Sequence, residues 1–170
     1  MMTALTGTPG TGKTTIAALL TARNMQVVSQ KETMAPYILE HDAERDTDII
    51  DDEAWVDAFV PVEGIIEGHL THLLPADRVV VLRCRPDILA TRLRARGYAE
   101  EKVQENAEAE ALDSILIEAL EVHPETHVTV IDTTEQLPEE TANAIEAFIR
   151  GDAPHSFTLP DWSEYLGRRV

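Results

Sequence analysis

Five short apolar stretches recur along the chain. They cover residues 2–7, 25–29, 64–68, 78–84 and 127–132. The last three are short, nearly continuous apolar runs, which is the pattern of strands buried on both faces of a sheet.

Segments with helical periodicity separate several of these stretches. Apolar side chains recur every three or four residues, and we expect helices over residues 13–23, 86–96, 99–121 and 138–150. The third is expected to be one long helix, with Val103, Ala107, Ala111 and Ile115 along one stripe. Residues 30–60 are polar and acidic, and we expect short helices there, with Trp55 and Phe59 on one helix face.

Buried strands that alternate with helices are typical of a parallel sheet covered on both faces. The sequence therefore predicts an α/β fold with a five-stranded parallel sheet. We find no internal repeat, and we expect residues 1–170 to form a single domain. Two segments are candidates for movement, at about residues 28–51 and 96–102.

Composition narrows the classes of function. The chain has 31 acidic and 14 basic residues, a formal net charge of −17. Such a surface repels phosphate backbones, which argues against direct binding to duplex nucleic acid. It could attract a basic partner protein, or it could reflect adaptation to high internal salt.

The single cysteine and the hydropathy indicate a cytoplasmic protein. Cys84 excludes an internal disulfide and is expected to be a buried strand residue. No apolar run approaches the ~18 residues of a membrane span. The first residues are too short and uncharged for a signal peptide.

Residues 7–14, GTPGTGKT, match the P-loop pattern G-x-x-x-x-G-K-[ST] between a predicted strand and a predicted helix. Its glycines allow successive backbone N–H groups to point at phosphate oxygens, and the following helix N-terminus favours the same anion. Lys13 can reach the β- and γ-phosphates, and the Thr14 hydroxyl can bind Mg²⁺. The motif predicts nucleotide binding without specifying the reaction.

An acid and a histidine follow the third apolar stretch, in EGH at residues 67–69. Ligands of open parallel sheets bind at the carboxyl ends of strands. We therefore expect Glu67 near the magnesium, through a water, and His69 near the γ-phosphate, where Gly68 would leave the backbone free to turn the ring. The alternatives are a capping role for Glu67 and a surface imidazole for His69; for His72 a structural role is favoured.

Arg92 and Arg96 lie on one face of a predicted helix that Gly97 ends. Arginines stabilise the charge that develops in phosphoryl transfer, so this pair could close over the phosphates as a lid. A solvated basic face is the alternative.

Taken together, GTPGTGKTT, EGHLTHLLP, VVVLRC, RLRARGY and KVQENAEAE resemble adenylate kinase isoenzyme six and its archaeal relatives, also known as the coilin-interacting nuclear ATPase family. The resemblance covers nearly the whole chain in order. It implies an adenylate-kinase-like P-loop NTPase fold, with a nucleoside monophosphate insert at about residues 28–51 and a short lid at about 95–105.

The same resemblance implies reversible phosphoryl transfer from ATP to AMP, ATPase activity, and a role in small ribosomal subunit maturation through a basic ribosomal protein. It implies ATP contacts from Gly10, Gly12, Lys13, Thr14, Thr15 and Arg96. The family's acid is usually aspartate where this chain has Glu67, and Thr33 stands near the place of an AMP-binding arginine. Lys31 and Arg45 are the remaining cations in the insert, and we assign them to AMP.

Two functions therefore follow from the sequence. One is an ATP:AMP phosphotransferase that uses Mg²⁺. The other is an ATPase assembly factor that grips a basic ribosomal protein, with AMP phosphorylation incidental. A small-metabolite kinase would explain the P-loop but not EGH.

Overall fold

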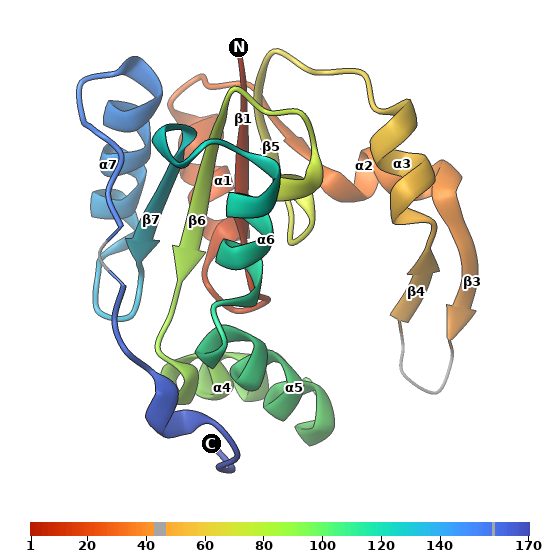
Figure 1. Cartoon of the computed structure of the whole chain (residues 1–170), viewed down its shortest axis with the longest axis vertical. Coiled ribbons are helices and arrows are strands. Elements are labelled where there is room, and N and C mark those ends of the chain that lie inside the picture. The colour runs from red at the N-terminus through yellow and green to blue at the C-terminus, as the bar shows by residue number, and fades with distance from the viewer. Residues whose placement is uncertain (43–46, 158) are drawn as a thin grey trace.

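The computed structural model describes residues 1–42, 47–157 and 159–170 (Figure 1). Its centre is a five-stranded sheet with the order β2-β5-β1-β6-β7, in which every neighbouring pair is parallel. The strands are β1 (Met2–Gly7), β2 (Val27–Ser29), β5 (Gly64–Glu67), β6 (Arg78–Arg83) and β7 (Val128–Asp132). The predicted α/β class and the five-stranded parallel sheet are confirmed.

Helices cover both faces of this sheet. The helices of the described residues are α1 (Lys13–Ala22), α2 (Gln30–Met34), α3 (Asp52–Ala58), α4 (Pro86–Ala95), α5 (Glu100–Ala111), α6 (Ser114–Val122) and α7 (Pro138–Arg150). Short 3-10 turns occupy Ala35–Tyr37, Thr71–Leu73, Glu125–His127 and Ser163–Tyr165. In Figure 1, α6 lies on one side of the sheet, and α1 and α7 lie on the other.

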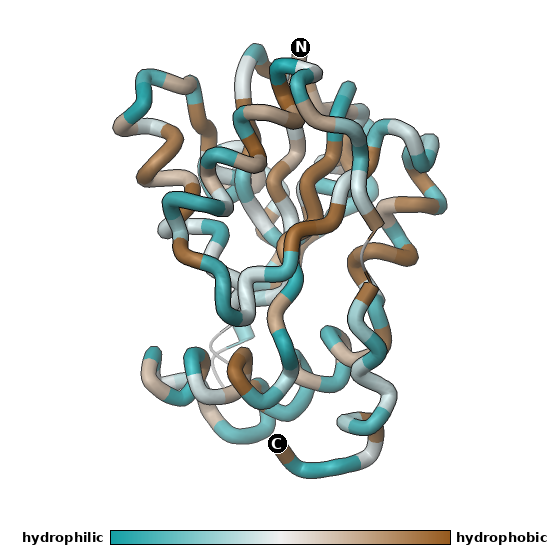
Figure 2. Tube along the Cα trace, turned by 90° about the vertical axis from the view of Figure 1, so that its left-hand side faces the viewer, coloured by the Kyte–Doolittle hydropathy of each residue, from teal (hydrophilic) through white to brown (hydrophobic). Residues whose placement is uncertain are grey.

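The core follows the two-residue period of the strands. Val79 and Val81 of β6 pack in one cluster with residues of α6, whereas Val80 and Leu82 pack in a second cluster with α1 and α7. All four side chains are fully buried. Figure 2 shows apolar segments of the chain in the middle of the molecule and polar segments around them. Burial on both faces explains why these strands read as continuous apolar runs.

The predicted helix over residues 99–121 is wrong in its length, because the structure has two helices there. The chain breaks between α5 and α6 at Asp113, which has a left-handed backbone with φ of 58°. The Asp113 carboxylate lies 2.5 Å from Arg83 Nη2. An aspartate tolerates this backbone region better than most residues, and the ion pair holds it there.

The insert also departs from the expectation of short helices alone. Strands β3 (Ile38–Asp42) and β4 (Thr47–Ile50) form an antiparallel pair between α2 and α3, set apart from the main sheet (Figure 1). The Trp55 and Phe59 rings do pack edge to face, 5.9 Å apart, although Phe59 follows the last residue of α3. Assignment of residues 28–51 to monophosphate binding stays a prediction.

The order of the strands in the sheet predicts a crevice at the carboxyl end of β1. The chain leaves β1 for β2 and β5 on one side, and continues to β6 and β7 on the other. Such a reversal of direction leaves a crevice outside the carboxyl ends of the strands. The turn from β1 to α1 lies at this point, with α4 and α5 at the same end of the molecule (Figure 1).

Candidate active site

The P-loop, Gly7–Thr14, joins the central strand β1 to α1. Gly10 and Gly12 have φ of 96° and 100°, a region in which residues with a Cβ are strained. Gly7 is required for a second reason, since a Cβ there would lie 2.4 Å from the carbonyl oxygen of Leu82. These glycines give the loop the curvature of an anion-binding turn before a helix.

Lys13 begins α1 and turns back over the loop. Its Nζ donates hydrogen bonds to the carbonyl oxygens of Gly7 and Thr8, at 2.6 and 3.0 Å. Burial lowers the pKa of Lys13 to about 8, while the charges of Glu67 and Glu110 act in the opposite direction and Arg96 lowers it further. A nearby anion would therefore hold this ammonium in its charged form.

Glu67 lies at the end of the strand that pairs with the strand leading into the P-loop. β5 pairs directly with β1, and Glu67, its last residue, lies opposite Leu5. One carboxylate oxygen accepts a hydrogen bond of 3.2 Å from the Ser29 hydroxyl at the end of β2. Glu67 thus stands at the carboxyl edge of three neighbouring strands, and its charge acts on Lys13.

His69 follows two residues later and is exposed. Partial desolvation of the ring is the main cause that lowers the pKa of His69 to about 4, and the charges of Lys13, His72 and Lys31 add to it. The ring is therefore neutral at pH 7 and can accept a hydrogen bond. The His69 carbonyl oxygen accepts a hydrogen bond of 3.3 Å from the Thr6 hydroxyl, so this turn lies at the carboxyl end of β1.

The role of Gly68 differs from the expected one, which was to leave the backbone free to turn the His69 ring. A Cβ at this position would lie 2.1 Å from Gln30 Oε1 and 2.4 Å from Gln30 Cβ. Gln30 is buried at 3% exposure, and its Oε1 accepts a hydrogen bond of 2.8 Å from the backbone N–H of Leu70. Glycine is therefore needed for close packing, which fixes the turn that carries His69.

His72 is structural, as expected. Its fully buried ring lies between the Thr6 hydroxyl, 3.0 Å from Nδ1, and Glu118, 2.8 Å from Nε2. Burial is the main cause that lowers the pKa of His72. The ring joins β1 to α6 beneath the turn that carries His69.

The two arginines occupy different environments. Arg92 of α4 donates to the carbonyl oxygens of Thr133 at 2.9 Å, and of Gly10 and Thr134 at 3.4 Å each. It therefore ties the P-loop to the turn that follows β7. Arg96 follows the last residue of α4, stacks on the Tyr98 ring at 5.4 Å, and lies close enough to Lys13 to lower its pKa.

The predicted AMP-binding residues are only partly described. Lys31 is exposed on α2, and its charge acts on His69. Arg45 lies outside the described residues. The Thr33 hydroxyl already has two partners within the fold. It donates a hydrogen bond to the Gln30 carbonyl oxygen and accepts one from the Trp55 indole N–H.

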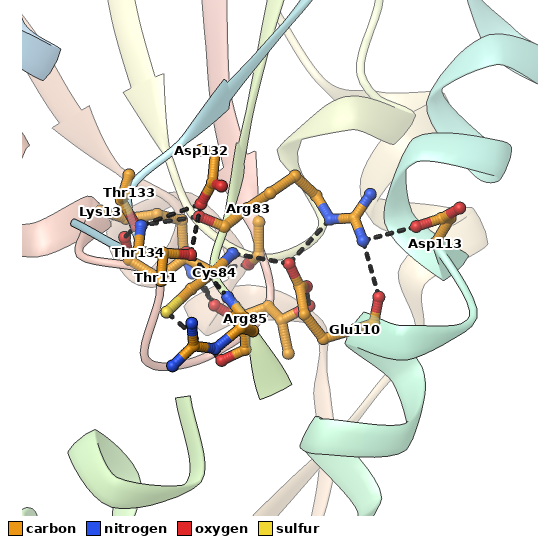
Figure 3. Close-up of polar contacts among 12 residues, drawn as sticks. Thr11, Lys13, Arg83, Cys84, Arg85, Glu110, Asp113, Asp132, Thr133 and Thr134 are labelled. Atoms are coloured by element: carbon orange, nitrogen blue, oxygen red, sulfur yellow. Dashed lines mark hydrogen bonds and ion pairs between the residues drawn. The ribbon is translucent and has the colours of Figure 1, made fainter. Parts of the chain in front are cut away.

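Sequence reasoning missed a buried acid beneath the P-loop. Glu110 of α5 is 2% exposed and accepts a hydrogen bond from the Thr8 hydroxyl at 2.5 Å. Its other oxygen accepts from Arg83 Nε at 2.7 Å and from the Cys84 N–H at 2.8 Å (Figure 3). Cys84 itself is fully buried, as expected, and burial raises its pKa to about 12.

No helix in the described part of the chain is long and apolar enough to cross a membrane. Within the same residues, no cluster of three or more His, Cys, Asp and Glu side chains could hold a metal by itself. Thr14, which is exposed at the start of α1, and the half-buried Glu67 remain the candidates for Mg²⁺.

Comparison with solved structures supports the nucleotide-kinase-like fold. The YorR protein of Bacillus subtilis, solved in complex with phosphorylated GDP, superposes with a TM-score of 0.53 and 19% identity, covering 89% of this chain and 97% of its own. A sugar kinase from Janibacter sp. HTCC2649 gives a TM-score of 0.55 and 18% identity, covering 88% and 94%. At these identities the likeness concerns the fold alone.

Sequence comparison gives nearer relatives. Residues 4–113 match the family described as "AAA domain". Proteins named "Putative adenylate kinase" are 48% identical in Archaeoglobus fulgidus, over 89% of this chain and 84% of the relative, and 46% identical in Natronomonas pharaonis, over 98% and 100%. A third, from Pyrococcus abyssi, is 42% identical over 96% and 92%. With its P-loop at the centre of a five-stranded parallel sheet, the chain belongs to the adenylate-kinase-like family of P-loop proteins.

Proposed function

We propose that the protein is a nucleoside monophosphate kinase that transfers the γ-phosphoryl group of ATP to AMP, reversibly. The observation that supports the proposal is the P-loop with its Lys13 at the carboxyl end of β1, next to the end of β5 that leads into Glu67 and His69. The names of the archaeal relatives agree with this activity.

In the proposed reaction, a phosphate oxygen of AMP forms a bond to the γ-phosphorus of ATP. The bond from that phosphorus to the β–γ bridging oxygen breaks, and two ADP molecules result. Catalysis of this transfer depends on positioning and on stabilising charge at the phosphate oxygens. The P-loop amides hold the β-phosphate, while Lys13 and Arg96 balance charge on the transferring group and the leaving oxygen. Arg92 holds the P-loop against the turn after β7.

The residues present fit a magnesium ion brought with ATP. Mg²⁺ prefers oxygen ligands, and it keeps several waters and phosphate oxygens when only one or two protein groups bind it. The Thr14 hydroxyl and the Glu67 carboxylate, directly or through water, supply such groups beside Lys13. When bound, the ion would neutralise charge on the β- and γ-phosphates.

AMP is assigned to the side of the crevice formed by residues 28–51. Lys31 is the described cation of this segment, and its charge acts on His69. We propose that Lys31, together with Arg45, binds the AMP phosphate. The turn between α4 and α5, within residues 95–105, would close over ATP as a short lid carrying Arg96.

A coupled assay of ADP formation from Mg²⁺ and ATP, with and without AMP, tests this function. We expect AMP to raise ADP formation at least tenfold over ATP alone, because kinases must favour their acceptor over water. The same assay with CMP, GMP and UMP measures acceptor preference. A rate that no monophosphate raises would contradict the kinase proposal and leave only ATP hydrolysis.

A second candidate function is an ATPase that assists small ribosomal subunit maturation by binding a basic ribosomal protein in the cytoplasm. The observation that favours it is the formal net charge of −17. On α6, Ile117 and Leu120 are 52% and 39% exposed, beside Glu118 and Glu121. Apolar side chains next to carboxylates suit a partner that is basic and partly apolar.

For this second function we expect binding to a basic ribosomal protein that weakens as salt rises. Exposed charges are screened beyond a Debye length of ~8 Å at 0.15 M salt. Titration of the protein with a basic small-subunit ribosomal protein, and separately with bare RNA, at several salt concentrations measures the effect. Tight binding to bare RNA with none to the basic protein would exclude this partner class.

A further inference from the structure

A buried ionic network connects the P-loop to the helix that follows the proposed lid. Glu110 lies in the last turn of α5, and Figure 3 shows its carboxylate directed at Arg83 and Cys84, with Asp113 on the far side of the guanidinium. Arg83 ends β6, is 1% exposed, and donates from Nη2 to the Glu110 carbonyl oxygen at 2.7 Å. The proposed reaction mechanism uses none of these groups.

Burying the charged pair of Arg83 and Glu110 costs free energy of desolvation. Desolvation of two charges can exceed their mutual attraction, so that apolar replacements are often as stable or more stable. Here one amino group of the guanidinium, Arg83 Nη1, is buried with no hydrogen-bond partner within the described residues. The Trp162 ring stacks 4.7 Å from the guanidinium carbon, which excludes water from the same group. A network retained at such a cost is a candidate for a functional role.

Thr8 connects this network to the catalytic lysine. Its hydroxyl donates to Glu110 at 2.5 Å, while its carbonyl oxygen accepts hydrogen bonds from Lys13 Nζ at 3.0 Å and from the Thr11 hydroxyl at 2.9 Å. Thr8 is 3% exposed. The position of its backbone therefore sets the curvature of the loop and the resting place of the Lys13 ammonium.

The other end of α5 begins immediately after the proposed lid turn. α5 starts at Glu100, and its Val103 packs with Leu89 and Leu93 of α4 in a separate apolar cluster. The helix is 12 residues long, and its first turn follows the segment that carries Arg96. α5 therefore runs from the proposed lid turn to Glu110 and the P-loop.

We propose that Glu110 is a positioning residue for phosphoryl transfer, which holds the P-loop in register with α5 through the hydroxyl of Thr8. Glu110 touches neither nucleotide nor phosphate; it acts through Thr8 and Lys13. This inference rests on the proposed kinase function, and it adds a mechanical connection between the lid turn and the phosphate site.

Substitution of Thr8 tests the proposal with little change in volume. Thr8→Val removes the hydroxyl, and Thr8→Ser keeps it. We expect Thr8→Val to lower kcat by about tenfold to a hundredfold, as small misplacements of a catalytic group do. The KM for ATP should change less than kcat, because the P-loop amides remain. Thr8→Ser should recover most of the lost kcat.

Thr129→Val is the matched control. Thr129 of β7 is also a buried threonine whose hydroxyl is hydrogen-bonded, in this case to the backbone of Ser156 at the sheet edge. It should lose a comparable amount of thermal stability while kcat keeps the parental value. Equal kcat in Thr8→Val and Thr129→Val, or equal damage in Thr8→Val and Thr8→Ser, would overturn the positioning role.

Glu110→Gln tests the other end of the same hydrogen bond, because it removes the charge of Glu110 and keeps the size of the side chain. We expect kcat to fall as in Thr8→Val, while the KM for ATP changes less.

Hydrogen exchange separates failure of this inference from failure of the proposed function. We expect the amides of residue 8 and residues 10–13 to exchange faster in Thr8→Val and Glu110→Gln than in Thr129→Val, whether or not the protein uses AMP. A parent chain that transfers no phosphoryl group would overturn the kinase function. Unchanged exchange at these amides would overturn the positioning role by itself.

Discussion

Lys13→Ala is expected to lower the kcat of phosphoryl transfer by about a hundredfold or more. Loss of one preorganised group that stabilises transition-state charge typically costs ~10²–10³ in kcat. Lys13 is the cation that the P-loop itself provides, and its Nζ lies within 3.0 Å of two loop carbonyl oxygens. Initial rates of ADP formation at saturating ATP and AMP measure the effect.

The pH profile gives this prediction an independent check. Lys13 is charged below its pKa and loses its proton as the pH rises through about 8. The pH dependence of kcat/KM reports groups of the free enzyme. The kcat/KM of the parent should therefore fall above about pH 8, and the kcat/KM of Lys13→Ala should show no such fall.

Arg150→Ala, which removes one positive charge from the exposed end of α7, is the control and should leave kcat unchanged. Activity of Lys13→Ala within a few-fold of the parent would contradict the assignment of the P-loop.

The parts of the site that were predictable from sequence depend on local rules. The P-loop was predictable because its backbone shape requires glycines at fixed spacing, and Gly10 and Gly12 do have positive φ. The position of Glu67 was predictable because parallel strands of one sheet end at the same edge. Both inferences use neighbours along the chain and one rule of topology.

The buried network under the P-loop depends on contacts between distant residues. Glu110 and Arg83 are 27 positions apart. Both stand in segments that carry the family resemblance, but no spacing rule along the chain pairs them. A signal was nevertheless present: Arg83 lies inside an apolar strand, and Glu110 lies seven residues after Val103, on the same stripe of the predicted helix. Opposite charges at two buried positions indicate that they pair, because neither is otherwise tolerated there.

The other differences arise where packing overrides the local pattern. The break at Asp113 follows no glycine or proline, and it depends on the ion pair with Arg83. The segment after α7 shows little periodicity, yet its Trp162 is 6% exposed because it covers the same guanidinium. Gly68 was expected to provide flexibility, whereas the Gln30 side chain occupies the space of its missing Cβ.

His69→Ala is expected to lower the kcat of ATP hydrolysis by about a hundredfold while leaving ATP affinity near the parental value. A positioned acid–base side chain contributes ~10²–10⁴-fold, chiefly in the transition state. The P-loop supplies the ground-state contacts to ATP, and His69 is outside that loop. With its pKa lowered to about 4, the ring is neutral at pH 7 and can accept a hydrogen bond from an attacking water.

AMP phosphorylation should fall less in the same variant. Water must be oriented and must lose a proton as it attacks, whereas the AMP phosphate, with a second pKa of ~6, is already largely deprotonated at pH 7. The nucleophilic oxygen of AMP is also positioned by its own binding site. The ratio of kinase to ATPase activity should therefore rise in His69→Ala, and it should return toward the parental ratio in His69→Asn, whose amide oxygen can accept a hydrogen bond.

His127→Ala is the matched control, because His127 is exposed at the opposite, amino-terminal end of β7. Single-turnover hydrolysis of bound ATP and equilibrium binding of a non-hydrolysable ATP analogue separate the two possible effects. Weaker analogue binding with unchanged turnover of bound ATP would make His69 a binding residue. Slower turnover with unchanged binding would place the ring beside the attacking water, because only an interaction formed in the transition state changes kcat alone.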